Sequence, residues 1–218
     1  MPLRPAPSPA QNRRGAVSKG CLIALAAVLI PLAIVAMVLT GGYNGLVGTQ
    51  EDAEQKWAQV ENQYQRRFDL VPNLVNTVKG AADFEQETLT AVTDARASVG
   101  QVQLPSNLPT DQASLDAYVG AQRSLGSALG RLFAVSENYP TLRATEGFRD
   151  LQSQLEGTEN RIAVARKDYT EAVAGFNKKV RRFPTNVIAG MFGFEKLPQF
   201  SVTEDVTQNP TVDFGGGE

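Results

Sequence analysis

The residues best suited to chemistry lie in the string QRRFDLVPNLVNTVKG, which begins at position 65. Arg66 and Arg67 are adjacent, Asp69 and Asn73 follow them, and Arg67 falls on an otherwise apolar helical seam. An arginine presents a planar fork of donors that matches a carboxylate or a phosphate. One interpretation is therefore a surface that recognises a partner protein through these four side chains.

A structural interpretation of the same string competes with this one. Asp69 or a nearby glutamate would pair with the arginines, and Pro72-Asn73 would restart the helix. Charges that flank a kink usually serve local structure, so the pattern by itself favours this alternative.

Catalytic chemistry finds little support elsewhere in the chain. The 218 residues include no histidine, which removes the commonest general base and the commonest metal ligand. The acidic clusters at 51–54 and 85–87 have neither an EF-hand loop nor a histidine companion, so we interpret them as solvated helix faces. No GxSxG is present, and no phosphate-binding glycine motif follows a strand. The sequence predicts no catalytic residue, no metal site and no cofactor.

The most apolar stretch runs from Cys21 to Leu39 and carries no charge. At about 1.5 Å of rise per residue, a helix of this length spans the ~30 Å hydrocarbon core of a bilayer. Pro31 is tolerated in a membrane helix. The stretch is longer than a secretory signal core and leads into a poor cleavage site, so an uncleaved membrane anchor over residues 21–40 is predicted.

The charges around this anchor predict its orientation. Four basic residues and no acidic residue precede the anchor; they are Arg4, Arg13, Arg14 and Lys19. After the anchor, three acidic residues come before the first basic residue, Lys56. The positive-inside rule places the N-terminus in the cytoplasm and the rest of the chain outside. Beyond residue 20 there are 17 basic and 23 acidic residues, a net charge of −6. Nucleic acid and anionic lipid headgroups are poor partners for a body of that charge.

Helical periodicity dominates between Tyr43 and Phe183. Apolar residues at 3-4 spacing predict a first helix that runs on from the anchor to Gly80, with a kink or short break near Leu70 because of Pro72. Gly126 and Gly130 are interpreted as small residues that let a neighbouring helix approach closely. Three further helices are predicted at about 83–102, 111–138 and 142–182.

The predicted fold is all-α: a single N-terminal transmembrane helix followed by an antiparallel, up-and-down four-helix bundle with coiled-coil packing. The apolar stretch 187–194 either packs back on the bundle or dips into the membrane surface. The predicted divisions are a disordered cytoplasmic tail (1–20), the transmembrane helix (21–40), the bundle (43–183), a short apolar segment (184–200) and a disordered tail (201–218).

Several strings in the chain are distinctive. The longest are YNGLV (43–47), QRRFDLVPNLVNTVKGAADFEQETL (65–89), ENYP (137–140) and FPTNVIAGMFGF (183–194), with shorter ones at Asp94-Ala95-Arg96, Thr158-Glu159 and Ala165-Arg166. Together these strings resemble the LemA family over about residues 43–194. The resemblance implies a bacterial membrane protein with one transmembrane helix and a four-helix bundle, and it carries over no catalytic residue. The Pro-rich start and the Gly-rich acidic tail depart from the family pattern.

The leading hypothesis is a non-enzymatic, single-pass scaffold or adaptor that presents its bundle on the outer side of the bacterial cytoplasmic membrane. The candidate partner-binding residues are Arg66, Arg67, Asp69 and Asn73, with Phe192 and Phe194 as possible docking groups. The expected partner is another membrane or envelope protein. Two alternatives stay open: an oligomer whose anchors line a pathway, which an anchor without polar groups disfavours, and a divalent-metal hydrolase that uses only carboxylates.

Overall fold

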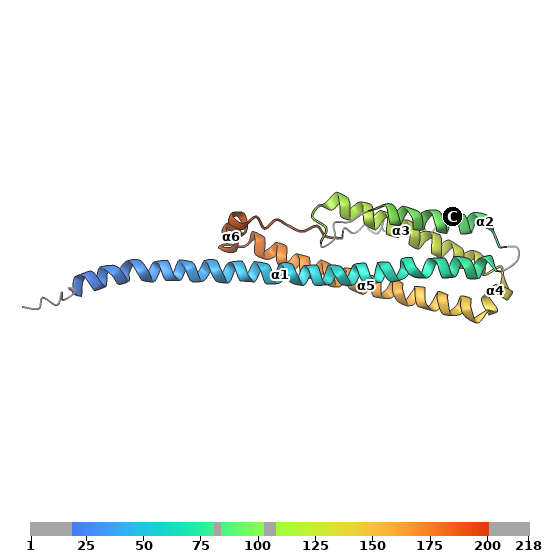
Figure 1. The fold of residues 1–218 in the computed structure, drawn as a ribbon, viewed down its shortest axis with the longest axis horizontal. Helices are drawn as coiled ribbons and strands as arrows, with labels where there is room; N and C mark the ends of the chain where they lie inside the picture. The colour runs from blue at the N-terminus through green and yellow to red at the C-terminus, as the bar shows by residue number, and fades with distance from the viewer. Residues whose placement is uncertain (1–18, 81–83, 103–107, 201–218) are drawn as a thin grey trace, which may run out of the picture. The chain divides into compact units, whose positions relative to one another are not determined.

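The computed structural model describes residues 19–80, 84–102 and 108–200 (Figure 1). Every regular element in these ranges is a helix, which confirms the predicted all-α class for the described part of the chain. The helices are α1 (Lys19–Lys79), α2 (Gln86–Gln101), α3 (Gln112–Ser136), α4 (Pro140–Ala144), α5 (Glu146–Arg181) and α6 (Thr185–Phe192). Of the predicted tails, residues 1–18 and 201–218 lie outside the described residues, as does residue 83, where the second predicted helix begins. Lys19 and Gly20, predicted as the end of the N-terminal tail, belong instead to α1.

The chain divides into two units between Gly42 and Tyr43. In the first unit, the apolar side chains of α1 from Leu22 to Val38 are exposed by 44–76%. Among the described residues, α1 is the one helix long and apolar enough to cross a membrane. A helix that exposes apolar side chains around its whole circumference is suited to lipid rather than to water.

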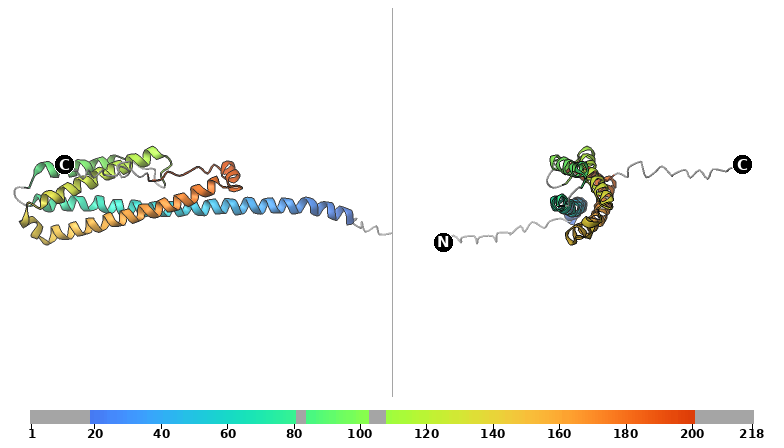
Figure 2. Two further views of the ribbon diagram at one scale, coloured as in Figure 1. Left: turned by 180° about the vertical axis from the view of Figure 1, so that it is seen from behind. Right: turned by 90° about the vertical axis from the view of Figure 1, so that its right-hand side faces the viewer.

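In the second unit, five helices contribute side chains to two buried apolar clusters, α4 through Leu142 alone. Cluster A lies toward the end of α1 and includes Val71 and Leu74 of α1 with residues of α2, α3 and α5. Cluster B lies earlier along α1 and includes Trp57 and Tyr64 with residues of α3 and α5 such as Tyr169. Helices α2 and α3 lie side by side, and α4 leads into α5 (Figures 1 and 2).

Helix α1 continues through Pro72 without interruption, so of the kink or short break predicted near Leu70, the break is wrong. Proline has no amide hydrogen, and in a helix this leaves the carbonyl of the residue four positions earlier without its donor. That carbonyl belongs to Phe68, and Arg96 Nε of α2 donates to it at 3.3 Å. The Arg96 guanidinium carbon also lies 3.8 Å from the centroid of the Phe68 ring. A neighbouring helix therefore supplies the hydrogen bond that Pro72 removes.

The segment after α5 packs back on the second unit. Ile188 and Ala189 of α6 are buried, and Gly193 ends the helix with a φ of 74°, a conformation that favours glycine. Beyond it, Asn177 of α5 exchanges two hydrogen bonds with the backbone of Leu197, at 2.8 and 2.9 Å. The Phe200 ring then stacks on Trp57 with centroids 6.3 Å apart.

Candidate functional site

A polar layer separates the two apolar clusters. On α1, Arg67 lies between Tyr64 of cluster B and Val71 of cluster A, at a position where the 3-4 spacing calls for an apolar residue. The layer is completed by Gln122 of α3 and Glu159 of α5; we call these three residues the Arg67 layer. Arg67 and Gln122 are each only 3% exposed. A buried guanidinium is costly unless it is paired and hydrogen-bonded.

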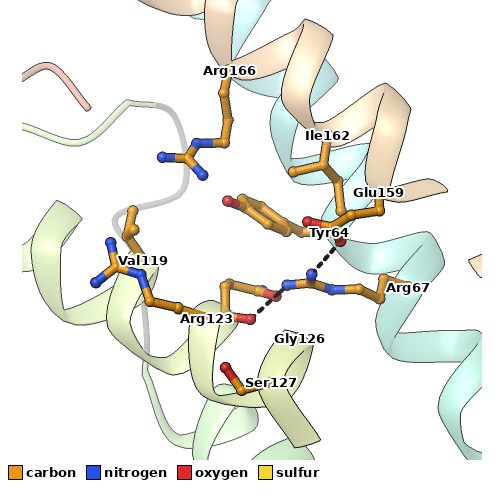
Figure 3. A pocket seen from close by; sticks show the side chains of 10 residues that line it. Tyr64, Arg67, Val119, Arg123, Gly126, Ser127, Glu159, Ile162 and Arg166 are labelled. Atoms are coloured by element: carbon orange, nitrogen blue, oxygen red, sulfur yellow. Dashed lines mark hydrogen bonds and ion pairs between the residues drawn. The ribbon is translucent and has the colours of Figure 1, made fainter. Parts of the chain in front are cut away.

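The Arg67 guanidinium is held by both neighbouring helices (Figure 3). Its Nη1 donates to Glu159 Oε2 at 2.7 Å, and its Nη2 donates to the backbone oxygen and to Oε1 of Gln122 at 2.8 and 2.6 Å. Its Nε is buried with no partner among the described residues. The Glu159 side chain is 61% exposed, so the ion pair joins a buried guanidinium to a carboxylate that reaches solvent. The layer ties α1, α3 and α5 together from inside.

A pocket of about 280 Å³ opens beside the Arg67 layer. Arg123 of α3 and Arg166 of α5 also line it, and in Figure 3 both guanidinium groups lie on the side of Tyr64 to which its hydroxyl points. Three guanidinium groups against the single carboxylate of Glu159 give the pocket a positive charge. This arrangement suits the binding of an anion.

Burial raises the pKa of Tyr64, and the nearby Arg166 and Arg67 oppose the rise. The Tyr64 phenol therefore stays neutral at physiological pH, and its ring lies 5.2 Å from the Arg67 guanidinium carbon. Burial also raises the pKa of the adjacent Tyr118 to about 12. These tyrosines contribute aromatic surface and neutral hydroxyl groups to the lining of cluster B.

The structure separates the predicted partner-binding residues of α1 into two sets. Arg67 is inside, whereas Arg66, Asp69 and Asn73 are exposed. Their spacing of three and seven residues places them on one side of α1, and we call them the exposed α1 stripe. Asp69 accepts a hydrogen bond from Gln65 Nε2 at 2.7 Å rather than from an arginine. The glutamate that pairs with Arg67 comes from α5, not from the local sequence.

Phe192 and Phe194 lie away from this stripe, at the beginning of the second unit. Their ring centroids are 4.9 and 5.7 Å from that of Tyr43, and Phe194 also contacts Phe176 at 6.4 Å. Phe192 keeps 56% of its surface exposed, while Phe194 is half-buried.

Sequence reasoning missed Glu159, Arg123 and Arg166. One signal pointed to the layer: Gln122 interrupts the apolar spacing of α3, as Arg67 interrupts that of α1, and two polar interruptions on facing helices can satisfy each other. The interpretation of Gly126 and Gly130 as a close helix contact is wrong. A methyl group at Gly126 would meet only Arg67 Nη1, at 3.5 Å, and one at Gly130 would meet nothing within 4 Å.

The chain matches the model of the LemA family over residues 56–214. It is similar to the magnetosome protein MamQ 2 of Paramagnetospirillum magneticum, with 31% identity over 191 residues that cover 79% of this chain and 70% of the relative. The magnetosome protein MamQ of Magnetospirillum gryphiswaldense is 27% identical, covering 88% and 75%. Protein LemA of Metamycoplasma hominis is 22% identical, covering 81% and 76%. This protein belongs to the LemA family.

Proposed function

We propose that this protein is a non-enzymatic, single-pass scaffold or adaptor of the bacterial envelope. Residues 21–40 anchor it in the cytoplasmic membrane, with residues 1–20 in the cytoplasm. Residues 43–183 form an antiparallel, up-and-down four-helix bundle from α1, α2, α3 and α5, displayed on the outer side. The exposed apolar surface of Leu22–Val38 and the N-terminal basic residues support this topology.

The observation that carries the proposal is how the structure divides the motif on α1. Arg67 is committed to Glu159 and Gln122 inside the fold, whereas Arg66, Asp69 and Asn73 are exposed. Charged and amide side chains on one helix face suit recognition of a polar protein surface. We assign partner contact to the exposed α1 stripe rather than to Phe192 and Phe194, whose rings pack on Tyr43.

The relatives fit a presentation role. Two of those named above are magnetosome proteins and one is Protein LemA. Such a spread of names is in keeping with a helical domain that serves different partners. The partner we expect here is another membrane or envelope protein.

The test is a charge swap with a matched control. Arg66→Glu/Asp69→Lys reverses the sign of both charges in the exposed α1 stripe. Arg149→Glu/Asp150→Lys makes the same two charge reversals at exposed positions of α5. A photo-crosslinking residue at Asn73 should give a discrete product in cells, which the first swap abolishes and the second retains, while both variants keep the wild-type thermal midpoint. A product that survives the first swap, or that is lost equally in both, would refute the stripe as a partner site.

A further inference from the structure

Helix α6 leaves an apolar face uncovered in the second unit. Ile188 and Ala189 are buried, but Phe183, Val187 and Met191 are exposed by 77%, 51% and 65%. Their spacing of four residues places Val187 and Met191 on one side of α6. Single exposed apolar residues are normal, whereas a group of them on one short segment marks a contact with something else.

Basic side chains gather beside this face. Between Ala174 and Phe200 the chain has five basic residues and a single acid, Glu195. The side chains of Lys178, Arg181, Arg182 and Lys196 line one open pocket of about 570 Å³, and none of the ion pairs described in the structure involves them. Such a cluster matches the phosphate groups of a ligand.

The exposed apolar face of α6 and the basic pocket beside it lie close to Tyr43 and Gly45, which follow the apolar stretch of α1. The Phe192 ring packs on Tyr43 at 4.9 Å, and Lys179 Nζ donates to the backbone oxygen of Gly45 at 2.9 Å. Tyr43 follows Leu39, the last residue of the apolar stretch, by four residues, and four residues of any conformation span at most about 14 Å. Chain connectivity therefore keeps this part of the second unit near the membrane surface.

We propose that this surface lies on the membrane. Phe183, Val187 and Met191 enter the interface between headgroups and acyl chains, and Lys178, Arg181, Arg182 and Lys196 contact the phosphate groups of anionic phospholipids. We call these seven residues the juxtamembrane surface. The inference rests on the proposed membrane span.

The net charge of the exported part does not oppose this contact. Exposed charges interact weakly beyond the Debye length of about 8–10 Å, so the local excess of cations decides what binds here. The expectation that anionic headgroups are poor partners holds for the body as a whole and not for this end of it.

The experiment uses the full chain, with Cys21 replaced by serine and single cysteines carrying an environment-sensitive fluorophore. The test position is Met191→Cys. Val164→Cys on α5 is the matched control, since Val164 is an apolar side chain exposed by 60%, and Leu32→Cys reports on the anchor. The proteins are reconstituted into phosphatidylcholine vesicles with or without phosphatidylglycerol, and brominated acyl chains serve as quenchers.

Quenching is expected at Leu32 and Met191 but not at Val164, with emission at Met191 reduced about twofold or more in anionic vesicles. Lys178→Gln/Arg181→Gln/Arg182→Gln should return the Met191 signal to its level in phosphatidylcholine. Lys179 is left unchanged because its Nζ donates to the backbone oxygen of Gly45. Quenching at Leu32 alone overturns this inference and leaves the anchor standing. No quenching at Leu32 overturns both.

Two further outcomes would also be decisive. A Met191 reporter that is blue-shifted yet unquenched lies against protein, either a second copy or a partner, and this overturns the membrane contact. Equal quenching with and without phosphatidylglycerol overturns the assignment of the basic cluster to anionic headgroups.

Discussion

At the scale of single residues, the Arg67 layer is the feature that most constrains the fold. A buried polar group that only one arrangement of helices can satisfy fixes their register, as polar residues do in coiled coils. Arg67 meets a backbone oxygen, an amide and a carboxylate from two other helices. A shift of one helix by a turn would leave at least one of these groups buried without its partner.

Replacement of Arg67 should therefore be costly, and the cost should depend on Gln122. We expect Arg67→Met to lower the free energy of unfolding by about 2 kcal/mol, because Gln122 Oε1 loses its donor inside the fold. In Arg67→Met/Gln122→Leu that orphaned amide is gone, and roughly 1 kcal/mol should be recovered. Chemical denaturation of the full chain in detergent, followed by circular dichroism, measures both values.

The neighbouring arginine provides the control for this prediction. Arg66 is exposed, so Arg66→Met should change stability by no more than about 0.5 kcal/mol. Equal effects of the two single substitutions would mean that Arg67 is not part of a buried network.

The buried tyrosines predict how stability depends on alkaline pH. The pKa of Tyr118 is raised by burial from 10.0 to about 12. Because the folded pKa lies above the unfolded one, the stabilisation is complete below pH 10 and is lost as the pH rises toward 12. In Tyr118→Phe, the free energy of unfolding should therefore fall less between about pH 9 and pH 12 than in the wild type, by up to roughly 2 kcal/mol. An unchanged loss in the variant would contradict the burial of this phenol.

At the scale of elements, the pairing of Pro72 with Arg96 explains how α1 remains continuous. We expect Arg96→Met to destabilise the protein by about 1–2 kcal/mol, because the Phe68 oxygen loses its donor and the ring loses its cation. In a Pro72→Ala background the helix regains its own amide donor for Phe68, so the same substitution should cost less. A double-mutant cycle by chemical denaturation gives the coupling, and a value of zero would mean that the Arg96 contact does not compensate for the proline.

The helices show how far sequence patterns reach in this protein. Periodicity located α3 closely, and Asp111 caps it by accepting from the Ser114 amide. The single helix predicted at about 142–182 is divided at Thr145, where α4 ends and α5 begins. The break at Pro72 was predicted wrongly because local rules do not include a donor from another helix. Arg67 looked like a candidate for surface recognition for the same reason: its partners, Gln122 and Glu159, lie 55 and 92 residues away. What the pattern could not give was the alignment of facing helices.

At the scale of the whole molecule, topology decides where partners are sought. Residues 1–20 contain four basic residues and no acidic residue, and this charge bias favours an N-terminus in the cytoplasm. In cells stripped of any outer envelope, an external protease should digest the chain beyond Gly42 while a cytoplasmic control protein stays intact. Replacement of Arg4, Arg13, Arg14 and Lys19 by glutamine should give a mixture of orientations and hence partial protection.

The two results lead to different biology. Digestion of the wild-type domain would direct the search for partners of the exposed α1 stripe to envelope proteins. Protection until the membrane is lysed would reverse the orientation, because the charge bias would then have been overridden by the domain itself. In that case the juxtamembrane surface would face the inner leaflet, where anionic lipids attract basic clusters by about 1 kcal/mol per Lys or Arg. Partner and lipid contacts on this chain would then both be cytoplasmic.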